Sequence, residues 1–110
     1  KLVRNTFLAV KVSYFNEIQN FCENKKISYK MVSALAANDQ RIGESHTQVP
    51  GPDGKKGFGG TCFPKDLNSL LFQYSKIGVD APILRASKFR NEQIDRPEKD
   101  WTSDKGRAVI

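Results

Sequence analysis

The segment LVRNTFLAVKVSYFNEIQNFCEN, residues 2–24, decides the fold class because helical periodicity runs through its whole length. Its apolar residues recur at steps of three and four, which is the period of one helix face. This face consists of Phe7, Val10, Tyr14, Ile18 and Phe21, and it is widened by Leu8, Val12, Phe15 and Cys22. We predict a long helix from Leu2 to about Asn24, with an apolar surface too broad for one small chain to cover.

A second, shorter helix is predicted over Tyr29 to Ala37. Ser28 precedes it and has a side chain suited to an N-cap. At helical spacing its inward residues would be Met31, Val32 and Leu35.

Two further helices follow later in the chain, one with Pro64 in its first turn and one beginning at Pro82. Gly78 ends the former and Pro97 stops the latter. Their apolar positions are Leu67, Leu70, Leu71, Tyr74 and Ile77 in the former, and Ile83, Leu84, Ala86, Phe89 and Ile94 in the latter.

The stretch from Asn38 to Gly60 holds six of the eight glycines and two of the five prolines, and it lacks apolar periodicity. We predict a long loop there, and loops of this length in compact domains are usually functional or disordered. Phe58 among glycines favours a folded loop that contacts a ligand. The chain shows no alternating strand pattern, so we predict an all-α domain over residues 1–97 and a polar tail over 98–110.

Composition limits the function classes. The 110 residues are 38% hydrophobic and 27% charged, which fits one small globular domain. No apolar run approaches the roughly 18 residues of a membrane span. The net charge of +6 suggests an anionic partner. Because the basic residues are scattered, with Lys25-Lys26 and Lys55-Lys56 as the only adjacent pairs, we favour a small phosphorylated ligand over nucleic acid.

The chain has two cysteines, too few for a disulfide framework. Cys22 lies in the apolar part of the first helix and is expected to be a core residue. Reduced thiols favour a cytoplasmic location. We expect no metal site, because two distant cysteines and His46, the only histidine, do not supply a zinc ligand set. We expect His46 to lie exposed in the polar loop.

Cys62 has a different setting, in the stretch GFGGTCFPKD over residues 57–66. It comes just before the helix expected to start at Pro64, where the helix dipole and unpaired backbone N–H groups stabilise a thiolate. Lys65 adds positive charge nearby. The glycines before Cys62 leave room for a substrate to approach. The residues alone are compatible with a reactive thiol or with a cysteine packed at a turn.

The same stretch closely resembles the active-site segment of the UDP-glucose/GDP-mannose dehydrogenase family, which reads approximately GxGGxCxPKD. Two other segments resemble the family in the same order. KLVRNTFLAVKVSYFNE, residues 1–17, is similar to its central helix, and NDQRIG, residues 38–43, is similar to its D-x-R-I-G segment. The R-I-G piece favours the UDP-glucose branch over the GDP-mannose branch.

The resemblance implies NAD-dependent oxidation of UDP-glucose to UDP-glucuronate in two steps, through a thiohemiacetal and a thioester on a cysteine. By the same resemblance, Cys62 is the nucleophile, and Lys1 and Asn5 stabilise charge on the substrate oxygen. At i and i+4 on a helix these two residues share a face. Asp66 helps to position water and the lysine.

The resemblance also implies binding roles. Arg41 reaches the sugar bound by the neighbouring subunit of a homodimer that packs through the long helix. Gly57, Phe58 and Gly59 lie along the nucleotide sugar, and Lys65 lies near NAD. No individual residue of 44–56 is aligned with the family.

The chain also departs from the family. The NAD-binding Rossmann domain and the C-terminal UDP-binding domain are absent from these residues, and the chain opens without Met. We therefore expect a piece of a longer protein that does not turn over alone. Three alternatives stay open: a non-catalytic helical dimerisation module, part of a GDP-mannose or UDP-N-acetylmannosamine dehydrogenase, and a basic helical nucleic-acid binder.

Overall fold

The computed structural model describes residues 1–102, and these form helices without any strand. In chain order the helices are α1 (Leu2–Lys25), α2 (Tyr29–Ala37), α3 (Cys62–Lys76) and α4 (Pro82–Arg90), followed by a π-helical turn η1 (Asn91–Asp95) and a 3₁₀ turn η2 (Asp100–Thr102). The all-α prediction is confirmed. None of the helices in residues 1–102 has the length and hydropathy needed to cross a membrane.

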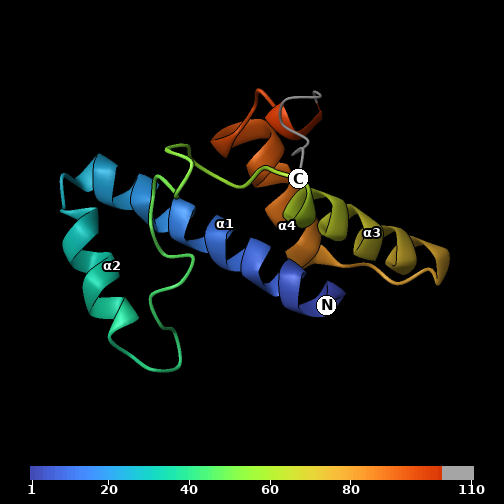
Figure 1. Cartoon of the computed structure of the whole chain (residues 1–110), viewed down its shortest axis with the longest axis horizontal. Helices are drawn as coiled ribbons and strands as arrows, with labels where there is room; N and C mark the ends of the chain where they lie inside the picture. The colour runs from blue at the N-terminus through green and yellow to red at the C-terminus, as the bar shows by residue number, and fades with distance from the viewer. Residues whose placement is uncertain (103–110) are drawn as a thin grey trace.

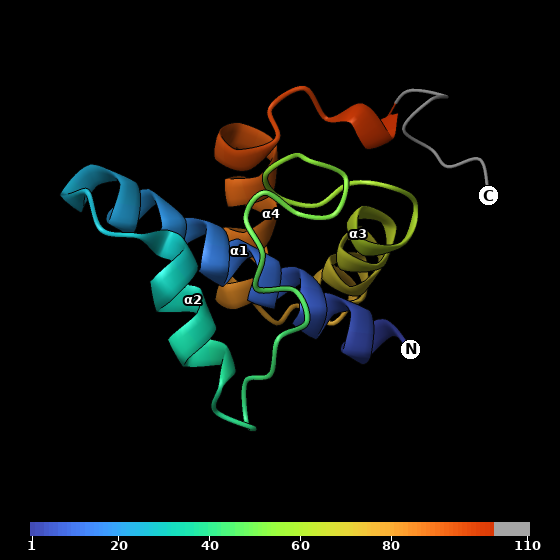
Figure 2. The same ribbon diagram turned by 60° about the vertical axis from the view of Figure 1, so that its left-hand side comes forward.

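The long helix α1 organises the molecule and contacts α2, α3 and α4 (Figure 1). In both views α2 lies at one end of α1, and α3 and α4 pack near the other (Figure 2). The core lies where α1, α3 and residues 51–60, here called the glycine loop, meet, and its buried members are Ala9, Phe58 and Leu67. The segment between Ala37 and Cys62 has neither helix nor strand, as predicted, and it returns beside α1 to the start of α3.

The local signals place the helix ends well. The Ser28 side chain accepts a hydrogen bond from the Met31 N–H and caps α2 as predicted. Gly78 follows α3 with a φ of 70°, a left-handed conformation that glycine adopts without strain. The predicted start of α3 at Pro64 is two residues late, because the helix begins at Cys62 itself with Thr61 as its N-cap.

The predicted inward face of α2 is wrong at two of its three positions within this chain. Met31 and Leu35 of α2 are 66% and 71% exposed. The predicted last helix changes to a π-helical turn after Arg90, and its apolar residues Ile83, Phe89 and Ile94 are exposed. The buried positions of this stretch are polar: Ser87, Asn91 and Asp95. The physical reason is that each finds a partner in the chain: Ser87 bonds Ser13 of α1, Asn91 bonds the glycine loop, and Asp95 forms an ion pair with Arg90.

The last described residues fold back onto the glycine loop. The Asp100 carboxylate accepts a hydrogen bond from Lys55 Nζ at 2.9 Å, and Trp101 lines a small hollow beside Phe58 and Pro64. Residues 103–110, which make up most of the predicted polar tail, lie outside the described residues.

Candidate functional site

Cys62 is the first residue of α3, and its thiol is exposed. The first-turn N–H groups of a helix have no partner within the helix and point toward this position. Thr61 precedes Cys62, and its Oγ1 lies 3.9 Å from Cys62 Sγ. Cys22, in contrast, is 2% exposed within α1, and both cysteines are free thiols. The core position predicted for Cys22 is confirmed.

One turn further along α3, the buried Asp66 joins this helix to the first turns of α1. Asn5 Nδ2 donates a hydrogen bond of 2.7 Å to Asp66 Oδ2. The Asn5 backbone N–H donates to the Lys1 carbonyl at 2.9 Å, which closes the first turn of α1. Thus Asn5 and Asp66, which were each predicted to belong to the catalytic site, are in direct contact although 61 positions apart in the chain, and Lys1 lies one turn before Asn5.

Side chains of α3 and η1 pack against the glycine loop before Cys62. The Phe58 ring is 6% exposed and packs edge-on against Phe63, with ring centroids 6.1 Å apart. Its observed role is therefore packing, and the predicted ligand contacts of Gly57, Phe58 and Gly59 stay predictions. Gly57 has a φ of 69°, and a Cβ there would overlap Asn91 Oδ1 and lie 2.9 Å from Asp95 Cβ.

Arg41 lies in a turn after α2 that is remote from the start of α3 in both ribbon views (Figures 1 and 2). Its side chain is 89% exposed, and its Nη2 lies 2.6 Å from Asp39 Oδ2. Lys11 Nζ of α1 donates to the neighbouring Ile42 carbonyl at 2.6 Å, which ties the turn to the long helix. Within one chain the structure does not bring Arg41 to Cys62.

Lys65 is exposed in the first turn of α3 and lines a hollow of about 400 Å³ with Gly60, Thr61 and Trp101. A cation beside the start of a helix fits the phosphates of a dinucleotide. Within the described residues, no three His, Cys, Asp or Glu side chains gather where they could hold a metal ion.

His46 lies on the α1 side of the loop, in a cavity of about 700 Å³ that also touches Gly57 and Phe63. It is exposed, as predicted, although its ring lies 5.6 Å from the Phe63 ring between centroids. Partial burial, together with the positive charge of Lys11, lowers the pKa of His46 below its usual value. The neutral ring is therefore favoured next to the cysteine loop.

Three buried polar side chains escaped the sequence-based reasoning: Asn16, Asn91 and Arg96, each 1–2% exposed. All three hydrogen-bond to the backbone of residues 56–58. Asn91 follows Leu84 by seven residues and therefore lies on the same helix face as that half-buried leucine. This spacing, with Ser87 between them, was the available signal that Asn91 is buried.

A comparison with known protein families identifies the family of this chain. A model described as the central domain of the UDP-glucose/GDP-mannose dehydrogenase family matches residues 1–93. The chain belongs to this family. The family resemblance stated from three motifs is thus confirmed over most of the chain.

Curated relatives agree with the family assignment. The chain is 37% identical to a UDP-glucose 6-dehydrogenase of Pseudomonas aeruginosa over 91 residues, which cover 83% of this chain and 19% of that protein. It is 38% identical to the Rickettsia conorii enzyme of the same name over 93 residues, or 84% and 20%. For the Bacillus subtilis UDP-glucose 6-dehydrogenase YwqF, the values are 35% over 94 residues, or 84% and 20%. The chain spans about a fifth of the length of these relatives.

Proposed function

We propose that this chain forms the cysteine-bearing helical domain of an NAD-dependent dehydrogenase that oxidises UDP-glucose to UDP-glucuronate. The observation that carries the proposal is the hydrogen bond between Asn5 and Asp66, one helical turn from the exposed thiol of Cys62. Relatives named UDP-glucose 6-dehydrogenase support the substrate class.

In the proposed reaction, the Cys62 thiolate adds to the carbon of the aldehyde that the first oxidation produces. Negative charge then develops on the aldehyde oxygen. Asn5 Nδ2 carries two N–H groups, of which one is donated to Asp66. We assign the second N–H, together with the Lys1 ammonium, to that oxygen, where fixed donors are usually a large catalytic contribution. The hydrogen bond to Asp66 holds the amide in the orientation this role needs.

The thiohemiacetal formed on Cys62 is oxidised to a thioester, and water hydrolyses the thioester to release the carboxylate and the thiol. We assign to Asp66 the positioning of this water and of Lys1, because Asp66 is 5% exposed and sits one turn after Cys62. NAD, when bound, supplies the two-electron acceptor for both oxidations. Lys65 is the residue of this chain that we assign to its phosphates, and most of its contacts would come from parts of the relatives outside the matched segment.

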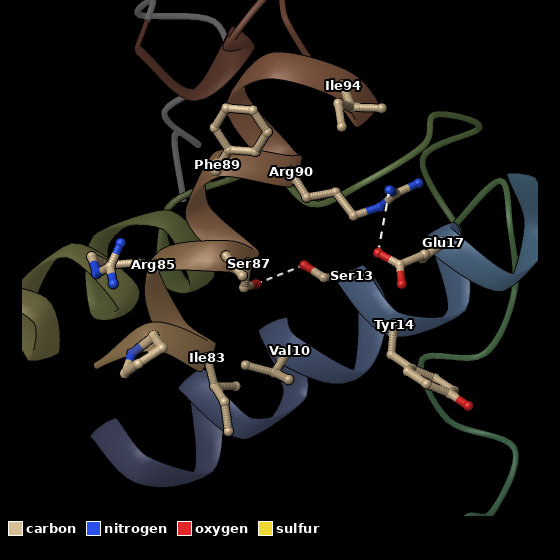
Figure 3. Close-up of a pocket in the computed structure, with 12 residues that line it drawn as sticks. Val10, Ser13, Tyr14, Glu17, Ile83, Arg85, Ser87, Phe89, Arg90 and Ile94 are labelled. Atoms are coloured by element: carbon tan, nitrogen blue, oxygen red, sulfur yellow. Dashed lines mark hydrogen bonds and ion pairs between the residues drawn. The ribbon is translucent and has the colours of Figure 1, made fainter. Parts of the chain in front are cut away.

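We further propose that two copies of the chain pair through α1. Its exposed apolar residues Val3, Phe7, Tyr14 and Phe21 share one face, on the side away from Asn5. Next to them, a groove of about 600 Å³ lies between α1 and α4. Figure 3 shows Val10 and Ile83 among its lining residues. A patch of this kind favours a protein partner.

In such a dimer, Arg41 would act on the partner's substrate. The support is the exposure of its side chain and the separation, in both ribbon views, of the turn after α2 from the start of α3 (Figures 1 and 2). The tie between Lys11 and the Ile42 carbonyl would fix the turn that presents it.

Cys62→Ser in the complete protein that contains this chain tests the proposal. Turnover should fall about 10³-fold or more, since a hydroxyl is a far weaker nucleophile than a thiolate at neutral pH. Cys22→Ala, which removes the buried thiol, is the matched control and should retain turnover. In the folded protein, iodoacetamide should also label Cys62 faster than Cys22. Full turnover by Cys62→Ser would overturn the mechanism, and equal labelling would favour a dimerisation module without catalysis.

A further inference from the structure

The amide of Asn91 makes two hydrogen bonds to a single residue of the glycine loop. The Phe58 N–H donates to Asn91 Oδ1 at 2.8 Å, and Asn91 Nδ2 donates to the Phe58 carbonyl at 2.9 Å. Asn91 is 2% exposed and starts the π-helical turn η1. A buried amide that matches a backbone donor and acceptor fixes the orientation of that peptide segment.

The residue before Phe58 is held in the same way. The Gly57 N–H donates to Asn16 Oδ1 at 3.1 Å, and Asn16 Nδ2 donates to the Val12 carbonyl of its own helix at 2.9 Å. Asn16 is thereby fixed on α1 before it meets the loop. Asp95, one turn after Asn91, closes the space behind Gly57.

Arg96 extends this support toward the start of the loop. Its side chain is 1% exposed; Nε donates to the Lys56 carbonyl at 3.0 Å and Nη2 to Asp53 Oδ2 at 2.8 Å. Its Nη1 lies directly behind Gly59, where a Cβ would overlap it. Only two residues separate Gly59 from Cys62.

We propose that Asn91 and Arg96 are positioning residues, which hold the glycine loop and thereby set the placement of Cys62 at the start of α3. They lie about 30 residues after the cysteine in the chain and act through the backbone of residues 56–59. The inference rests on the proposed function for the reactive role of Cys62. It gives a role to the segment that follows α4, for which the sequence analysis predicted none.

The test compares Asn91→Ala with Tyr29→Phe in the complete protein that contains this chain. Both variants remove side-chain hydrogen bonds to a loop carbonyl, but Tyr29 bonds the Thr47 carbonyl, far from Cys62 along the loop. Asn91→Ala should slow iodoacetamide alkylation of Cys62 and lower kcat for UDP-glucose by about tenfold, with a smaller change in KM. Tyr29→Phe should leave both rates within about twofold. Equal rates in the two variants would overturn the proposal.

A purely structural role would lower the folded fraction in both variants and leave the rate constants of the folded protein unchanged, which also overturns the proposal. If Asn91→Ala does not fold, the alkylation rate and kcat of Arg96→Lys test the proposal instead. A lysine can keep an ion pair with Asp53 but not the guanidinium bond to the Lys56 carbonyl, so a drop of about threefold in both rates is expected. Wild-type rates in Arg96→Lys would then overturn the proposal. If the wild-type protein does not oxidise UDP-glucose, the proposed function fails, and the alkylation rates still decide the positioning role.

Discussion

The two sides of α1 differ in what covers them. On the side of α3 and the glycine loop, the buried side chains include Asn16, Asn91 and Arg96, and all of them have partners within the chain. On the outer side, Phe7 and Tyr14 are 64% and 57% exposed beside the groove that α4 lines. Buried polar groups need specific partners, whereas exposed apolar groups need only cover.

One chain covers the inner side of α1 by itself but leaves the apolar residues of the outer side exposed. Side chains of this chain hold the backbone of the loop in front of Cys62, so we expect the geometry of the loop to survive in a single copy. The outer face should gain its cover from a second copy. Substitutions on the two sides should therefore affect different measurements.

On the inner side, the largest effect is expected from Asn5→Ala, which removes the amide between Asp66 and the proposed oxyanion. It should lower kcat by about 10²-fold or more, the usual cost of one such donor. Steady-state kinetics of the complete protein measure it. Asn24→Ala, at the exposed end of the same helix, is the control. A kcat for Asn5→Ala equal to that of the control would remove Asn5 from the mechanism.

Gly57→Ala should destabilise the fold for two reasons. The new Cβ would overlap Asn91, and the alanine would be strained at the left-handed φ of 69°. Strain and overpacking together should lower the free energy of unfolding by about 3 kcal/mol. Gly60→Ala is the matched control, since its φ is 75° but open space surrounds its Cβ. It should cost only about 1 kcal/mol. Urea unfolding that finds equal losses would contradict the tight support of the loop.

The outer side is tested by Phe7→Asp. Placing a charge in the exposed apolar stripe should weaken dimer association about tenfold to a hundredfold, the equivalent of losing one buried aromatic side chain. Sedimentation equilibrium measures the dissociation constant. Gln73→Asp, on the exposed face of α3, should leave it unchanged. A wild-type chain that stays monomeric at every concentration would contradict the dimer.

The smallest effect concerns His46, whose pKa is lowered in the folded state by burial and by Lys11. Below about pH 6.5 the unfolded chain binds a proton on this residue that the folded chain resists. Unfolding free energy should thus fall as the pH drops from 6.5 toward the folded pKa, and His46→Gln should show less of this fall. Denaturant unfolding at pH 7.5 and 5.5 measures the difference. Identical pH dependence in both proteins would show that His46 is not coupled to folding.

The helices and three motifs of the site were predictable from sequence, because N-caps, helix-ending glycines and the cysteine segment are local signals. The inward face of α2 was not. Periodicity assigns Met31 and Leu35 to the interior, and the structure leaves both of them exposed. Periodicity reports which face is apolar, but the identity of the partner, whether loop backbone or second chain, depends on contacts distant in sequence.

The contact between Asn5 and Asp66 shows what a sequence motif predicts and what it does not. Each residue was assigned to the site by its motif, yet their hydrogen bond of 2.7 Å depends on how α1 and α3 pack. The supporting residues Asn91 and Arg96 lie in no motif, and the motif that contains Asn16 gives no role for it, because all three satisfy the backbone of the glycine loop.

The central claim is that Cys62 forms the covalent intermediate. The most direct measurement is peptide mass analysis of the complete protein, quenched in acid during turnover of UDP-glucose and NAD. The account predicts an added mass on the peptide that contains Cys62, none on the peptide with Cys22, and none at either position without NAD. Steady product formation with Cys62 unmodified at every quench time, or an adduct on another residue, would contradict it.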